Sequence, residues 1–296
     1  MHLLIPCLLR AKRFHLAATN SAVAFSTILV YDRAHIPRST PNSELLRLSG
    51  TIFLILVAGA WAGIQNALAG GGSFITLPAL IFAGLNPLQA NITSTVALFP
   101  GQVATGLANR KLVSGTPQLS FRMLFMLSLM GGGLGGLLLL FTPENVFARL
   151  VPWLVLFATL VFAWGNFMRK PVSTGAHLGG IGTGIAQFCI AIYGGYFGGG
   201  IGFLMLAALS LAGMQARRGA ATKNVLAAVM NAAAALIFAF SGAVNWGEAA
   251  ALGVGAIAGG LIGAKMLSLF PENILRIVVV LIGAALTVGL FLRPVS

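Results

Sequence analysis

Residues 70–98 read GGGSFITLPALIFAGLNPLQANITSTVAL, and residues 199–227 repeat this pattern in altered form as GGIGFLMLAALSLAGMQARRGAATKNVLA. Both stretches contain a glycine run, a short apolar segment, a second glycine and a polar cluster, at an offset of 129 positions. A glycine break at the same place in two membrane-embedded halves is the best sequence indication of a transporter's binding site. The sequence therefore predicts two repeats of about 129 residues each.

The composition is that of a membrane protein, with 58% hydrophobic and 8% charged residues and a mean hydropathy of +0.95. A hydrocarbon core of about 30 Å needs roughly 20 apolar residues per helix. We predict an all-α polytopic membrane protein with about eight crossings, at 50–68, 88–109, 119–141, 147–168, 176–195, 219–241, 246–269 and 274–292. Its expected location is a cell membrane, the bacterial inner membrane in particular, and its expected surroundings are the lipid bilayer.

The formal net charge of +13 comes from 18 Lys and Arg against 5 Asp and Glu. Because the basic residues lie in the tails and between the predicted helices, the positive-inside bias accounts for most of them. We therefore predict no nucleic-acid partner, and assembly into a homo-oligomer is left open.

The predicted organisation has three parts. Residues 1–49 form an N-terminal extension, residues 50–170 the first transmembrane repeat and residues 171–296 the second. The extension has one modest apolar stretch, 16–31, which polar residues interrupt. We expect the extension to be cytosolic or disordered, or the product of a start site assigned too early, and a ninth helix at 16–31 is the alternative.

Two apolar segments, 73–84 and 202–213, are too short to cross a bilayer and are predicted to be re-entrant or half-helices. Non-helical backbone survives at membrane depth only where protein or a watery cavity satisfies it. We therefore expect the residues that open these segments to line a cavity: Gly70, Gly71, Gly72, Ser73, Gly199 and Gly200. The alternative is that the glycines only allow close helix packing, as we expect for Gly131 and Gly135.

The basic residues also predict a topology. If the short segments do not cross, then Arg110, Lys111 and Arg169 fall on the cytoplasmic side together with residue 49, whereas Arg217 and Arg218 fall outside. With four crossings per half, the repeats would be parallel, related by an axis along the membrane normal.

Lys223 is the residue that most favours an anionic substrate. It stands near the start of an apolar helix without a carboxylate nearby in the sequence, and a lysine in the membrane is costly unless it is paired or hydrated. Helix N-termini also attract anions. We predict a two-sided clamp for a small anion, formed in the second half by Thr222, Lys223 and Asn224 and in the first half by Asn91, Thr93, Ser94 and Thr95. The alternative is a lysine that snorkels to the interface.

These residues resemble the TauE/SafE sulfite-exporter family of membrane permeases over residues 50–292. The resemblance rests on GGGSF at 70–74, on QANITSTVALFPG at 89–101 and on ATKNVL at 221–226. It implies a duplicated multi-span permease for small anions such as sulfite and sulfonates. The second polar motif departs from the family's Thr-Ser type and reads Thr-Lys-Asn, which resembles a large subgroup whose substrates are mostly unassigned.

An enzyme and a structural or assembly protein are the rival classes. Three of the four histidines lie in the N-terminal extension, and the sequence lacks HExxH, GxSxG and a paired intramembrane carboxylate. We predict no catalytic residues, no metal site and no cofactor. A structural protein would not require an unpaired Lys223 or matched polar breaks in both halves.

Overall fold

The structure is a computed structural model that describes residues 41–68, 70–108, 110–164, 178–266 and 272–292. The chain divides into two compact units, residues 1–49 and residues 50–296. The predictions for residues 1–40, including the alternative helix at 16–31, lie outside the described residues. The larger unit contains both glycine runs and Lys223.

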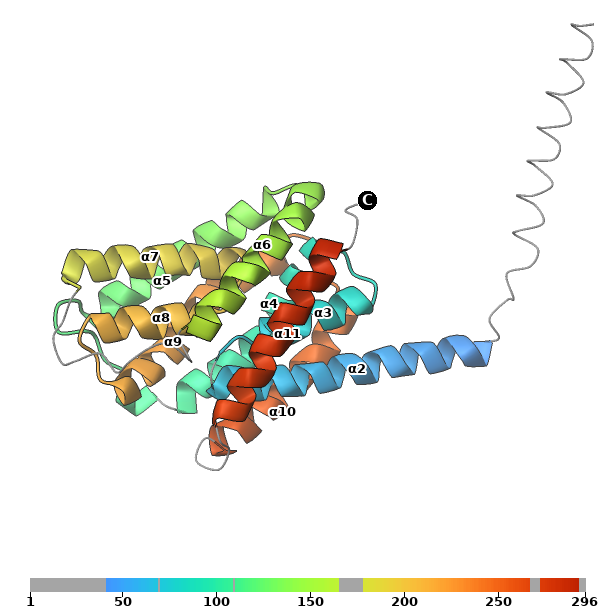
Figure 1. The fold of residues 1–296 in the computed structure, drawn as a ribbon, viewed down its shortest axis with the longest axis horizontal. Coiled ribbons are helices and arrows are strands. Elements are labelled where there is room, and N and C mark those ends of the chain that lie inside the picture. Colours follow the sequence, from blue (N-terminus) through green and yellow to red (C-terminus); the bar gives the residue numbers. More distant parts are fainter. Residues whose placement is uncertain (1–40, 69, 109, 165–177, 267–271, 293–296) are drawn as a thin grey trace, which may run out of the picture. The chain divides into compact units, whose positions relative to one another are not determined.

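The described part of the chain is helical and contains no strand. In the first half lie α2 (Pro41–Leu68), α3 (Ser73–Phe82), α4 (Pro87–Ala108), the 3₁₀ turn η1 (Arg110–Leu112), α5 (Phe121–Leu140) and α6 (Glu144–Ala163). In the second half lie α7 (Gly180–Tyr196), α8 (Ile201–Leu211), α9 (Ala216–Ala239), α10 (Trp246–Met266) and α11 (Glu272–Leu292) (Figure 1).

The prediction of an all-helical membrane protein is confirmed, whereas the count of eight crossings remains a prediction. Among the residues that the structure describes, five helices are long and apolar enough to span a bilayer, within Ser49–Ala67, Phe121–Leu140, Glu144–Val161, Arg217–Ala239 and Trp246–Gly263. Shorter apolar helices occupy Ser73–Phe82 and Ile201–Leu211, where the two short segments were predicted.

Glycines allow the helix backbones to approach closely. In α5, a Cβ atom added to Gly135 would collide with the backbone of Ile192 in α7, and one added to Gly132 with the backbone of Met230 in α9. α5 therefore packs along both helices, and α10 packs along α4 in the same way (Figure 1). Packing through small residues is expected between membrane helices. An apolar side chain gains little by moving from lipid tails to another helix, so close contact between backbones stabilises the pair instead.

The direction of the helices follows from pairs of contacts. Along α2 and α10, Gly59 abuts Leu252 and Gly63 abuts Ala256, so the two helices are parallel. Along α4 and α10, Gly253 lies near Ala97 and Gly260 near Thr105. α2 and α4 therefore point the same way, and the chain between them must return. The short helix α3 lies in this return.

α4 and α9 run in opposite directions. Gln102 is hydrogen-bonded to Asn231, and the next turn of α4 brings Gly106 beside Val225, so residue numbers fall along α9 as they rise along α4. The expectation of parallel repeats is therefore wrong. It assumed that each half crosses the membrane four times. The chain returns between α2 and α4, so its path through the first half differs from the one on which that expectation rested.

This arrangement also corrects the predicted distribution of charge. Thr222 in α9 exchanges two hydrogen bonds with the backbone of Ser114, which follows α4 and η1. The basic residues at the start of α9 and the end of α4 therefore lie at the same end of the larger unit, rather than on opposite sides: Arg217, Arg218, Arg110 and Lys111. Gly50 in α2 lies toward the other end, since α2 and α4 are parallel.

Candidate anion site between the two glycine breaks

The two glycine runs meet inside the molecule. Gly70 and Gly71 have φ angles of +83° and +88°, and Gly200 has +74°, a backbone region that side chains with a Cβ rarely adopt. A Cβ atom added to Gly70 would lie 3.3 Å from Cα of Gly202. The glycines therefore serve two purposes, which are the sharp turn into each short helix and the close contact between the turns.

Residues of α2 provide hydrogen-bond partners for the backbone of the first glycine break. Gln65 Nε2 donates to Gly70 O over 3.1 Å, and Gly70 N donates to Gln65 O over 2.9 Å. Gly72 N donates to Asn66 Oδ1 over 2.8 Å. These bonds supply the partners that non-helical backbone needs away from water, and they hold the entry to α3 in place.

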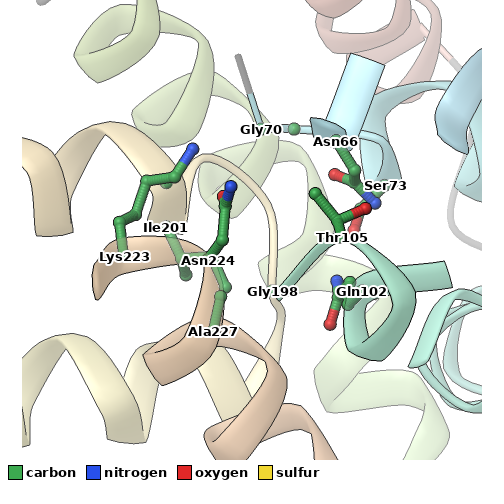
Figure 2. A pocket seen from close by; sticks show the side chains of 12 residues that line it. Asn66, Gly70, Ser73, Gln102, Thr105, Gly198, Ile201, Lys223, Asn224 and Ala227 are labelled. Carbon is green, nitrogen blue, oxygen red and sulfur yellow. The ribbon is translucent and has the colours of Figure 1, made fainter. Parts of the chain in front are cut away.

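A cavity of about 30 Å³ opens where the breaks meet. A single water needs about 10–15 Å³ by the same measure, so the cavity holds a few atoms. It is lined by Asn66, Gly70, Gly71, Ser73, Gln102, Thr105, Gly198, Ile201, Gly202, Lys223, Asn224 and Ala227 (Figure 2).

Lys223 is the one cation of the cavity wall. Its side chain is 5% exposed, and its Nζ atom lies 3.9 Å from the position that a Cβ of Gly70 would take. The described residues give it neither a hydrogen bond nor an ion pair. None of the lining residues is acidic, so the ammonium group has no countercharge in the cavity.

Neutral polar groups stand opposite the lysine. In Figure 2, Lys223 and Asn224 come from α9 on one side, whereas Asn66, Ser73, Gln102 and Thr105 come from α2, α3 and α4 on the other. Thr105 Oγ1 is already engaged, because it donates to Gly101 O over 2.9 Å. The other three side chains offer the cavity hydroxyl and amide donors.

The polar cluster of the first half does not line this cavity. Ser94 shares a 2.6 Å hydrogen bond with Thr76, and Thr93 Oγ1 accepts from Asn245 N over 3.1 Å. Asn91 Nδ2 donates to Tyr196 O over 3.0 Å. These buried groups are used within the protein rather than facing the lysine.

The remaining predicted positions divide in the same way. Thr95 donates to the carbonyl of Asn91, and Thr222 is bonded to Ser114. Gly72, Gly199 and Gly200 shape the breaks without lining the cavity. The structure thus groups five predicted residues at the cavity: Gly70, Gly71, Ser73, Lys223 and Asn224.

The sequence interpretation missed the polar residues that face Lys223. Asn66 lies four positions before Gly70 in an apolar stretch, and Gln102 lies in the middle of a predicted span. Isolated amides in such segments are costly unless they are paired or functional. That cost was the signal that could have identified both residues.

The described residues hold no group of three or more His, Cys, Asp or Glu side chains that could bind a metal ion. The exposed Glu144 accepts a hydrogen bond from Asn86 Nδ2, away from the cavity. Together, the geometry provides a small, partly open cationic cavity with neutral donors.

Comparison with known proteins agrees with this architecture. The family model for the sulfite exporter TauE/SafE matches residues 55–290. The chain is 28% identical over 247 residues to the probable membrane transporter protein YfcA of Escherichia coli strain K12, covering 82% of this chain and 89% of the relative. It is 30% identical over 243 residues to the probable membrane transporter protein ORF9 of a Sinorhizobium species, covering 81% and 92%. The chain belongs to the sulfite exporter TauE/SafE family.

Proposed function

We propose that this protein is a permease that binds a small anion, such as sulfite or a sulfonate, against Lys223 between its two halves. We place it in the bacterial inner membrane, because the relatives named above are bacterial probable membrane transporters. The observation that carries the proposal is the buried ammonium group that lacks a countercharge in a cavity bounded by both glycine breaks.

The buried charge of Lys223 needs compensation. An unpaired charge away from water costs several kcal/mol, and residues of this kind inside membrane proteins mark substrate or ion pathways. An anion in the cavity supplies the missing charge. Because the described cavity wall contains no carboxylate, a cationic substrate has no matching group.

The backbone adds to the same preference. α3 begins at Ser73 and α8 at Ile201, and both residues line the cavity. The N-terminus of a helix carries a partial positive charge and unpaired N–H groups. Broken helices whose N-termini point at an anionic group are a recurring design in transporters.

The size of the cavity restricts the substrate in this conformation. Its volume of about 30 Å³ suits an ion of a few atoms better than a large organic molecule. We therefore rank sulfite and short sulfonates above bulky anions.

The test is flux of radiolabelled sulfite and methanesulfonate into proteoliposomes. We expect saturable flux for the natural protein. Lys223→Gln keeps the length and polarity of the side chain but removes its charge, and the affinity should fall by about 1.5–3 kcal/mol, roughly 10- to 150-fold. Lys223→Arg should restore only part of the affinity, because its planar fork needs a different pocket.

Lys111→Gln is the matched control, since Lys111 is exposed in η1. It should leave the affinity unchanged. The proposal is wrong if Lys223→Gln protein folds, reaches the membrane and carries these anions with unchanged affinity. A structural or assembly protein would show no saturable flux in any variant.

A further inference from the structure

Gln102 is a cavity residue whose side chain is held by a side chain outside the cavity. Asn231 Nδ2 donates to Gln102 Oε1 over 2.7 Å. Gln102 lines the cavity, whereas Asn231 does not, and the side chain of Asn231 is 5% exposed. The bond joins the middle of α4 to the middle of α9.

The chemistry of the two amides makes this bond directional. A glutamine side chain has one acceptor oxygen and an NH₂ donor. Asn231 occupies the oxygen, so the group that Gln102 has left is the Nε2 donor, for which the described residues provide no hydrogen-bond partner. Asn231 uses its Nδ2 in this bond, and its buried Oδ1 has no partner among the described residues.

We propose that Gln102 is a second ligand of the transported anion, facing Lys223 across the cavity, and that Asn231 is a positioning residue that acts through it. This rests on the proposed function of the cavity. Lys223 supplies charge without direction, whereas the amide of Gln102 supplies one directed donor. The pair therefore favours an anion that presents two separate acceptor atoms.

A double-mutant cycle tests the proposal, with the KM for sulfite and methanesulfonate flux as the measurement. Gln102→Met is close in size and removes the donor, and we expect KM to rise by about tenfold, as for a lost hydrogen bond to a charged group. Asn231→Leu leaves Gln102 free to turn, and KM should rise by about threefold to tenfold. Because Asn231 acts through Gln102, the double variant should match Gln102→Met rather than show the product of the two losses.

Gln102→Glu gives a second readout that a merely structural bond would not produce. A glutamate at this position still accepts from Asn231 Nδ2, so the contact between α4 and α9 is kept. Its carboxylate places a negative charge opposite Lys223. We expect saturable anion flux to disappear while the melting temperature in detergent stays at or above that of the natural protein.

The outcomes separate this inference from the proposed function. If the natural protein shows no saturable flux, or if Lys223→Gln leaves KM unchanged, then the proposed function fails. Suppose instead that the natural protein shows saturable flux and Lys223→Gln raises KM. The inference about Gln102 and Asn231 is then overturned if Gln102→Met or Gln102→Glu keeps the natural KM. It is also overturned if the increases in KM of the two single variants multiply in the double variant. Should Gln102→Met fail to fold, Gln102→Leu takes its place in the cycle, because it also removes the donor.

Discussion

Asn231 and Gln102, which share a 2.7 Å hydrogen bond, are 129 positions apart, the same offset that relates the two glycine runs. Residues at equivalent positions of two repeats meet where the axis that relates the repeats passes. Since α4 and α9 are antiparallel at this contact, such an axis lies across the helices rather than along them. We therefore expect inverted repeats, with the axis in the plane of the membrane.

The first prediction concerns topology. Arg110 follows α4 and Arg217 lies in the first turn of α9, at the same end of the larger unit, and clusters of basic residues favour the cytoplasmic side. In a variant whose Cys7 and Cys189 are replaced by Ser, Arg110→Cys and Arg217→Cys should resist an impermeant thiol reagent added to intact cells. Asn145→Cys, in the first turn of α6 at the opposite end, should react readily.

Permeabilised cells provide the control for this experiment, because all three cysteines should then react. Ready labelling of Arg217→Cys together with protection of Arg110→Cys would support the charge distribution expected for parallel repeats and contradict the antiparallel arrangement of α4 and α9.

The second prediction concerns the contact between the glycine breaks. Gly70→Ala forces a side chain into a backbone with φ of +83° and against Gly202. We expect a loss of about 1–3 kcal/mol in stability, together with weaker transport, because Gly70 also lines the cavity. The measurements are the melting temperature in detergent and sulfite flux.

Gly289→Ala is the matched control, since a Cβ atom there would have no neighbour within 4 Å. It lies in α11, where alanine is the better helix former. The melting temperature should be unchanged or slightly higher. Equal effects of the two substitutions would argue against a special role for the break at Gly70.

The third prediction separates Thr222 from its neighbour Lys223. Thr222 Oγ1 both donates to and accepts from the backbone of Ser114, at 3.1 Å in each case. Thr222→Val keeps the shape but leaves both backbone groups without this partner, so we expect a loss of about 1–3 kcal/mol in stability. The affinity for the anion should change little, because Thr222 does not line the cavity.

Thr222→Ser retains the hydroxyl and should keep most of the stability. A large rise in KM for Thr222→Val, with an unchanged melting temperature, would instead support a direct contact between Thr222 and the substrate, as in the clamp that the sequence suggested.

The sequence by itself determined that the protein lies in a lipid bilayer and is all-helical, because apolar runs of about 20 residues are typical of membrane-spanning helices. It also predicted the two short helices, since glycine runs are local features that can be read without knowledge of packing. The directions of the helices could not be predicted in this way. They depend on whether the chain returns between the long helices, and the distribution of basic residues in the sequence favoured parallel repeats. The role of Lys223 in binding stays a prediction.

Only the tertiary structure decided which polar groups face the cavity. Ser94 and Lys223 occupy equivalent positions in the sequence repeat, yet Ser94 bonds to Thr76 whereas Lys223 faces Gly70. A hydroxyl can be satisfied by a neighbouring helix, whereas the charge of an ammonium group is not balanced by neutral partners. Which partner a buried polar side chain finds depends on the helix packed beside it. For Gln102 that helix is α9, from the other half of the chain.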